Sequence, residues 1–279
     1  MFRLRHILTL LLSLMVAQLM GQTPQETTIN ASHRRYVTPT GAYSNRGTTW
    51  ADAKNNIQDA INDLVASNLL PGEVWVKEGT YRPTESTESG GSSLFASFKI
   101  PAGITVRGGF AGNEVTLNDR MVKYLDKDGK TVGTAKIGDT FDKDYTEKRF
   151  LHPTILTGDL SSRQANFTWN DQSHRYATQF YGNAYHVVWF ATNGFYSNGR
   201  AKALRLNDAS WTATLEGVTI MRGYAYNSSL EGHPHNAYGG GAYMVDGSMM
   251  RDVRIECCEA SRNGGAIYMD GGGVCDHVF

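Results

Sequence analysis

The sequence predicts an all-β protein, a single-stranded right-handed parallel β-helix (solenoid) with an N-terminal amphipathic cap helix and loop insertions. Three observations lead to this prediction: short apolar runs broken by glycine, no helical periodicity between those runs, and an internal repeat near the C-terminus. Thirty glycines against seven prolines in 279 residues also suit a turn-rich β protein better than a helical one.

The first residues have the pattern of a signal peptide. Arg3 and Arg5 precede an apolar run from Ile7 to Ala17, and the small Gly21 follows it. A membrane span needs roughly twenty consecutive apolar residues, so we expect this shorter run to be cleaved, which leaves no transmembrane helix. The protein is therefore expected to be exported.

These patterns predict three regions. The signal peptide covers residues 1–21, an N-terminal lead-in and cap helix covers 22–72, and the parallel β-helix covers 73–279. Without the signal peptide, 25 basic and 27 acidic residues give a net charge of −2. Such a balance does not favour nucleic acid as a partner.

The three cysteines do not form a paired framework. Cys257, Cys258 and Cys275 are an odd number in a chain destined for an oxidising compartment, and no spacing of cysteine and histidine matches a metal site. We expect three buried, unpaired thiols that behave as small apolar residues.

An amphipathic helix is predicted near the start of the mature chain. Thr49 is the expected N-cap, Asp52 the acid three residues later, and Pro71-Gly72 ends the segment. A helix with one dry side at the start of a β protein is expected to cover the first layer of sheet. Its apolar positions are Trp50, Ala53, Ile57, Ala60, Ile61, Leu64 and Val65.

From residue 74 onward the pattern changes to short strands. Long polar insertions interrupt them, the largest at roughly 113–148 and 161–183. The absence of helical patterns between the strands argues against a doubly wound sheet, in which parallel strands need helical crossovers. The clearest strands are Val74-Trp75-Val76, Ile104-Thr105-Val106, Thr154-Ile155-Leu156 and Tyr185-His186-Val187-Val188.

The repeat determines the expected register. Residues 240–247 align with residues 264–271 at a displacement of 24, which is too short for a propeller blade. A partial third copy, residues 215–220, precedes residues 250–255 by 35, which we interpret as one repeat plus an 11-residue loop. The gapless displacement predicts that three pairs lie in register: Gly240 with Gly264, Ala242 with Ala266, and Ile255 with Phe279.

At these residues the chain resembles the right-handed parallel β-helix proteins of the pectin-lyase-like superfamily, and among them those with polymorphic outer-membrane protein repeats. The likeness covers about residues 36–279. The matching segments are Tyr36–Gly41, Thr49–Ala53, Val74–Tyr81, Gly103–Gly112, Ile155–Asp159, Gly217–Ile220 and the two Gly-Gly-Ala blocks.

The resemblance implies a location more than an activity. It implies a secreted protein or one on the cell outer membrane, in contact with a glycan or with the surface of a host or neighbouring cell. A C-terminal region absent from this chain would anchor it to the outer membrane or serve secretion. We expect the chain to be a fragment or an early-terminated member of a longer protein, because Phe279 falls within a repeat.

No catalytic residue, cofactor site or metal site stands out. The 24-residue displacement would stack Asp246 on Asp270 and Asp252 on Asp276, and either pair could share Ca²⁺. Aspartate beside glycine is more often a turn residue that caps its own backbone, and we favour that interpretation. Residues 126–129 predict a hairpin tip rather than a calcium loop, and His233-Pro234-His235 lacks a third metal ligand.

The insertion from Phe167 to Tyr196 is rich in aromatic residues. Exposed rings beside amide side chains can stack on sugars, whereas rings that fix the loop to the sheet wall would be buried, and we favour the second reading. The candidates for glycan contact are Trp169, Tyr176, Tyr181 and Tyr196.

Two functions remain open. The first is a noncatalytic scaffold for adhesion or glycan contact, which we favour because glycine geometry explains all the motifs. The second is a polysaccharide lyase or glycoside hydrolase that acts on acidic glycans, which would need acids and bases gathered on one wall of the fold.

Overall fold

The computed structural model describes residues 29–85, 93–160, 182–191, 195–197, 200–202, 212–226 and 237–279. The chain divides into two units, Met1–Asn30 and Ala31–Phe279, and the described helices and strands belong to the second. The signal peptide predicted at residues 1–21 lies outside the described residues.

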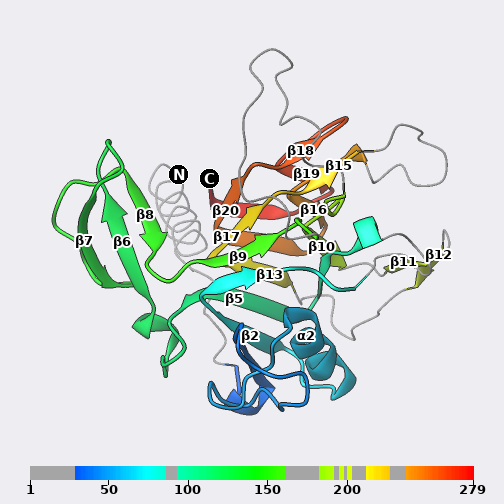
Figure 1. Cartoon of the computed structure of the whole chain (residues 1–279), viewed down its shortest axis with the longest axis horizontal. Coiled ribbons are helices and arrows are strands. Elements are labelled where there is room, and N and C mark those ends of the chain that lie inside the picture. Colours follow the sequence, from blue (N-terminus) through cyan, green and yellow to red (C-terminus); the bar gives the residue numbers. More distant parts are fainter. Residues whose placement is uncertain are drawn as a thin grey trace, which may run out of the picture. The chain divides into compact units, whose positions relative to one another are not determined.

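The largest sheet of the second unit has nine strands, and its pairings are all parallel (Figure 1). Its order is β1-β2-β5-β13-β17-β14-β9-β3, and β20 pairs with β17 beside this path. The long β17 joins the two halves, because its start pairs with β13 and its end with β14. The bounds are β1 Arg34–Val37, β2 Gly72–Lys77, β3 Gly79–Tyr81, β5 Ile104–Phe110, β9 Thr154–Thr157, β13 Ala213–Glu216, β14 Val218–Met221, β17 Ser248–Glu256 and β20 Val274–Val278.

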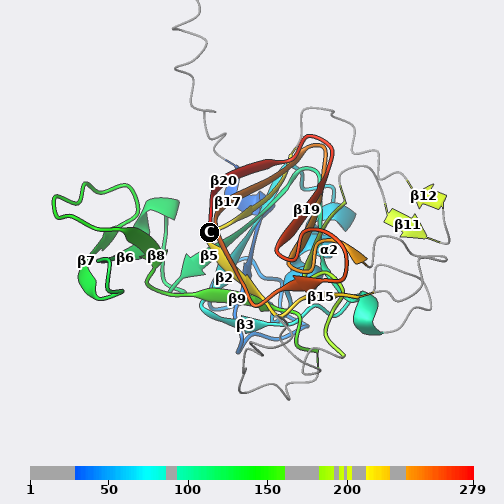
Figure 2. The same ribbon diagram turned by 90° about the horizontal axis from the view of Figure 1, so that it is seen from above.

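A second parallel sheet, in the order β19-β16-β10-β4, completes the walls of the core. Seen from above, β17 and β20 lie along one side and β19 along another (Figure 2). The strands are β4 Phe98–Pro101, β10 Val188–Ala191, β16 Ala242–Val245 and β19 Ile267–Asp270; the parallel ribbon of β15 Tyr224–Ala225 and β18 Glu259–Ala260 adds a short further side.

The predicted insertion at 113–148 forms a sheet of its own. Its strands are antiparallel in the order β7-β6-β8, with bounds β6 Met121–Leu125, β7 Thr131–Lys136 and β8 Glu147–Phe150. A separate antiparallel ribbon joins β11 Phe195–Ser197 and β12 Arg200–Lys202. The short 3-10 helices are η1 Ala31–His33, η2 Ser93–Phe95 and η3 Leu117–Asp119.

The predicted fold class, a single right-handed parallel β-helix, is therefore wrong as stated. The protein is mostly β, but its strands form separate sheets that include one large parallel sheet and an antiparallel three-stranded sheet. The prediction extended a repeat that covers only the last strands over the whole chain. Short apolar runs also do not reveal whether a strand pairs in parallel or antiparallel.

The core is held by apolar residues that stack from strand to strand. Val74, Val106, Leu215 and Met250 lie in register on β2, β5, β13 and β17, and all four are fully buried. Burying such a side chain stabilises the fold by about 1.5–3 kcal/mol. The strands predicted at 74–76, 104–106 and 154–156 are confirmed, whereas the fourth begins only at Val188.

The amphipathic helix is present as α2, Ile57–Ala66, and contacts β1, β2 and β4. Its start differs from the prediction. Asn56, not Thr49, is the N-cap, since its side-chain oxygen accepts hydrogen bonds from the N–H groups of Gln58 and Asp59. Thr49 and Asp52 instead close a turn that places Trp50 among the rings of Tyr36, Trp75 and Phe110.

The register of the repeat also differs from the prediction. The strands pair Ala242 with Ile267 and Met250 with Cys275, a displacement of 25 rather than 24. Each of the three predicted pairs is therefore displaced by one residue. The 35-residue displacement is confirmed, because Ile220 pairs with Ile255.

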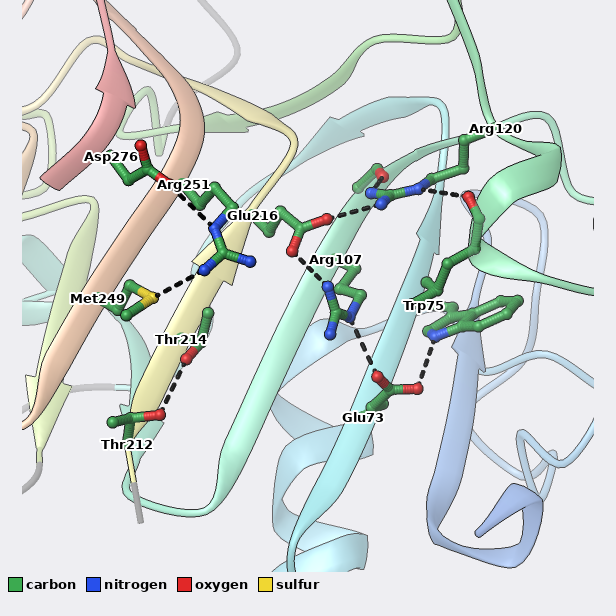
Figure 3. Close-up of polar contacts among 12 residues, drawn as sticks. Glu73, Trp75, Arg107, Arg120, Thr212, Thr214, Glu216, Met249, Arg251 and Asp276 are labelled. Carbon is green, nitrogen blue, oxygen red and sulfur yellow. Dashed lines mark hydrogen bonds and ion pairs between the residues drawn. The ribbon is translucent and has the colours of Figure 1, made fainter. Parts of the chain in front are cut away.

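A row of alternating charges crosses the nine-stranded sheet (Figure 3). Arg107, Glu216, Arg251 and Asp276 lie in register on β5, β13, β17 and β20. The Glu216 carboxylate pairs with Arg107 and, at 2.6 Å, with Arg120; the guanidinium of Arg107 is 3.0 Å from Glu73.

Glu216 is the centre of this network. Burial alone would raise its pKa, but the guanidinium groups of Arg107 and Arg120 outweigh burial and hold the pKa below its usual value. Each of these charges is thus compensated within the fold.

Removing Glu216 is expected to destabilise the protein strongly. Glu216→Ala leaves the buried Arg120 without its carboxylate, and we expect a loss of about 3 kcal/mol in the free energy of unfolding, measured in urea. Because the folded pKa is lowered, the wild type loses this stabilisation as pH falls below the ordinary value of 4.5, whereas the variant has none to lose there. Asp276→Asn, at the exposed end of the row, is the control and should cost under about 1 kcal/mol. Equal effects of the two substitutions would contradict this account.

Candidate functional site

A groove lies between the antiparallel sheet and the parallel strands β9, β14 and β17, on the side of the molecule where β8 approaches β9 (Figure 1). It holds about 250 Å³ of open volume. Its walls combine charged residues of β8 with residues of β9, β14 and β17, so segments far apart in the sequence meet here.

Phe150 fixes one wall of the groove to the parallel sheets. Its ring lies against Gly109 and Gly217, both with positive φ, where a Cβ atom would collide with the ring. The guanidinium of Arg120 lies 5.1 Å from the centre of the same ring. Glycine at these two corners therefore makes room for the antiparallel sheet to dock.

Asp252 occupies the position on β17 that is equivalent to Gly217 on the neighbouring strand. Gly217, Asp252 and His277 occupy equivalent positions on neighbouring strands and have φ values of +69°, +49° and +51°. Aspartate tolerates this left-handed conformation better than most residues, though less well than glycine. The Asp252 carboxyl lines the groove beyond Phe150.

Two arginines engage the glutamates of the groove. Glu147 accepts hydrogen bonds from Arg149 at 2.7 and 2.8 Å and pairs with Arg254 at 2.5 Å, and Arg254 also pairs with Glu256. The hydrogen bond from Arg149 is the main reason that the pKa of Glu147 is lowered; burial opposes it. The ionised form of Glu147 is therefore favoured.

Three charged groups of the groove remain without such partners. Among the residues that the structure describes, the side chains of Lys123, Lys148 and Asp252 have no hydrogen bond or ion pair. Burial raises the pKa of Asp252, the charge of Glu216 adds to this effect, and Lys148 opposes it. The groove thus offers two free ammonium groups and one partly desolvated carboxyl.

This arrangement suits binding better than hydrolysis. Two ammonium groups can neutralise acid groups of a ligand, and a free carboxyl can accept hydrogen bonds from hydroxyl groups. Glycoside hydrolysis needs two available carboxyls about 5–10 Å apart. Within the described part of the groove, Asp252 is the one carboxyl that no arginine engages.

The stacked aspartates proposed from the repeat are not in register. Asp270 lies beside Val245 and accepts a hydrogen bond from the Tyr243 hydroxyl at 3.2 Å, while Asp246 accepts one from the backbone N–H of Gly272. Arg251, not Asp252, lies beside Asp276. The described residues include no group of three His, Cys, Asp or Glu that could hold a metal ion, so the Ca²⁺ hypothesis gains no support.

Two other sequence interpretations can be compared with the structure. The hairpin tip at residues 126–129 is confirmed, because it joins the antiparallel β6 and β7, and Asp126 accepts hydrogen bonds from the N–H groups of Asp128 and Lys130. His233-Pro234-His235 lies outside the described residues. The prediction of three buried thiols is wrong for the whole residues, because Cys257 and Cys258 are half-buried and Cys275 is exposed. Burial nevertheless raises the pKa of the Cys258 thiol to about 12.

The predicted glycan-contact residues cannot be located. Trp169, Tyr176 and Tyr181 lie outside the described residues, and Tyr196 is described only as part of the backbone of β11. The groove residues Lys123, Lys148 and Asp252 were missed as a group. The one available signal was the alignment of Asp252 with Gly217, which places a side chain where the neighbouring strand has none.

The fold defines a mostly β protein built on a large parallel sheet, with a charged groove beside an antiparallel insertion. No protein-family model, curated protein or solved structure matches the chain. In the described part of the chain, no helix is both long and apolar enough to cross a membrane.

The contact between Phe150 and Gly217 can be measured by substitution. Gly217→Ala places a Cβ atom 2.9 Å from the Phe150 ring at a positive φ, so we expect a loss of about 2–3 kcal/mol in the free energy of unfolding. The matched control is Gly129→Ala, which has a φ of +75° but no atom within 4 Å, and should cost about 1 kcal/mol. Equal losses would show that Phe150 does not anchor the insertion.

Proposed function

We propose that the protein is an exported surface protein that binds acidic glycans in the groove without cleaving them. The observation that carries this proposal is the presence of two unpartnered lysines, Lys123 and Lys148, among the residues that line a 250 Å³ groove. They extend from opposite faces of the antiparallel sheet, since Lys123 lies beside Arg149 and Lys148 beside Tyr124. Acid groups of a glycan would supply the partners that these two side chains lack.

The ion pairs around the lysines support binding of an anion in the groove. Arg149 and Arg254 form the ion pairs with Glu147 and Glu256, and Lys123 acts on Glu147 through its charge without pairing with it. The lysines extend from a sheet anchored through Phe150, so the backbone that carries them is positioned before a ligand arrives. A site organised in advance loses less entropy on binding.

Export and surface location rest on the sequence. Arg3, Arg5 and the apolar run that follows favour secretion or the cell outer membrane, where glycans of a host or a neighbouring cell are available.

Cleavage of acidic glycans is the alternative, and one observation favours it. A carboxyl with a raised pKa, such as that of Asp252, is typical of a general acid. A hydrolase would also need a second available carboxyl, and the described groove offers none without an arginine partner. Noncatalytic binding therefore remains the better supported function.

Binding is expected to depend on the two lysines. In the chain lacking residues 1–21, the double substitution Lys123→Ala and Lys148→Ala should weaken binding of galacturonic acid oligomers at least about tenfold, measured by calorimetry. Raising the salt concentration should also weaken the binding of these oligomers by the wild type.

The matched control replaces two exposed lysines of the same insertion, Lys130 and Lys143, by alanine, which changes the net charge equally. An equal loss in both double variants would contradict a specific site in the groove. Parallel incubation should give neither unsaturated uronate absorbance nor new reducing ends; either product would favour the enzyme alternative.

A further inference from the structure

Asp252 is the residue of the groove that the structure explains least. The equivalent corner on the neighbouring strand is Gly217, which meets the same backbone requirement without a side chain. Aspartate at a φ of +49° carries a conformational cost that glycine avoids. The fold therefore does not need a carboxyl at this corner.

The carboxyl also does not act as a turn residue. A turn aspartate caps its own backbone, as Asp126 does at the hairpin tip. The side chain of Asp252 makes no hydrogen bond among the described residues, although it is partly buried. A partly desolvated carboxyl without donors is stabilised when a ligand brings donors to it.

The charges around Asp252 come from several elements. Lys148 of β8, His277 of β20 and Arg120 after η3 favour its ionised form, whereas Glu216 of β13 opposes it. Burial has the largest effect and raises its pKa. None of these groups donates a hydrogen bond to the carboxyl, and Asp252 is among the residues that line the groove.

We propose that Asp252 selects among acidic glycans: it accepts hydrogen bonds from the hydroxyl groups of a sugar whose acid groups bind Lys123 and Lys148, and it repels chains in which sulfate replaces those hydroxyls. This inference rests on the proposed function. A uronic acid unit carries both features, a carboxylate and neighbouring hydroxyls. A densely sulfated unit brings more negative charge and no hydroxyl donor, so the carboxyl lowers its affinity.

The experiment compares two ligands on four forms of the purified chain. The ligands are a galacturonic acid oligomer and a sulfated oligomer of equal length in which every ring hydroxyl is esterified. The forms are the wild type, Asp252→Asn, Asp252→Gly and the control Asp276→Asn. Asparagine tolerates positive φ and glycine adopts it freely, so neither variant at position 252 should fail to fold. Asp276→Asn removes the same charge outside the groove, at the exposed end of the charge row.

The wild type should bind the uronate oligomer at least about tenfold more tightly than the sulfated one. Both substitutions of Asp252 should weaken uronate binding about tenfold and tighten binding of the sulfated oligomer, while Asp276→Asn keeps the wild-type preference. If Asp252→Gly leaves the preference unchanged, or changes the affinity for both oligomers in the same direction, the inference about Asp252 is overturned and the proposed function is not. A wild type that binds neither oligomer overturns the proposed function and the inference with it.

Discussion

The left-handed corner between the two halves of the nine-stranded sheet is the constraint on which the rest of the structure depends. Strand β17 pairs with β13 before Asp252 and with β14 after it, so the chain must change direction at this residue. Neighbouring strands turn at Gly217 and at His277 with the same sign of φ. Since the corners stack, the sheets on either side keep their register.

The corner also explains how the insertion is attached. Where the corner residues are glycine, the ring of Phe150 packs directly on the backbone, and the antiparallel sheet follows it. The groove lies beside this contact, and Phe150, Gly217 and Asp252 all line it. Near the groove, Glu216 is buried and pairs with Arg107 and Arg120. Without these two arginines it would be a buried, unpaired charge.

Sequence periodicity predicted the strands, the helix and the 35-residue displacement, because each depends on local spacing of apolar residues. It could not decide between displacements of 24 and 25. Three consecutive glycines, 239–241, match Gly264-Gly265 in either alignment, and the 25-residue alignment also pairs Tyr243 with Tyr268. In the structure the displacement is 25. Ala242 pairs with Ile267, and Gly239 and Gly264, which are also 25 residues apart, both have positive φ. The predicted fold class was wrong for a related reason. The repeat is visible only near the C-terminus, and the sequence pattern does not show how far it extends toward the N-terminus.

The groove was beyond prediction because its residues meet only after folding. Lys123 and Lys148 belong to an insertion that showed no repeat, and they line the same groove as Asp252 only because Phe150 docks that insertion on the corner. The sequence directed attention instead to the aromatic residues of the later insertion. Composition identifies surfaces rich in one residue type, whereas a site built from three dissimilar residues gives no such signal.

The most direct test of the account is to locate the bound glycan. Amide chemical shifts of the isotope-labelled chain would be measured by NMR as a galacturonic acid oligomer is added. The account predicts that the largest changes fall on residues 122–123, 147–150, 217–219 and 252–256, which line the groove. Changes confined to residues 161–181, with the groove amides unaffected, would contradict it.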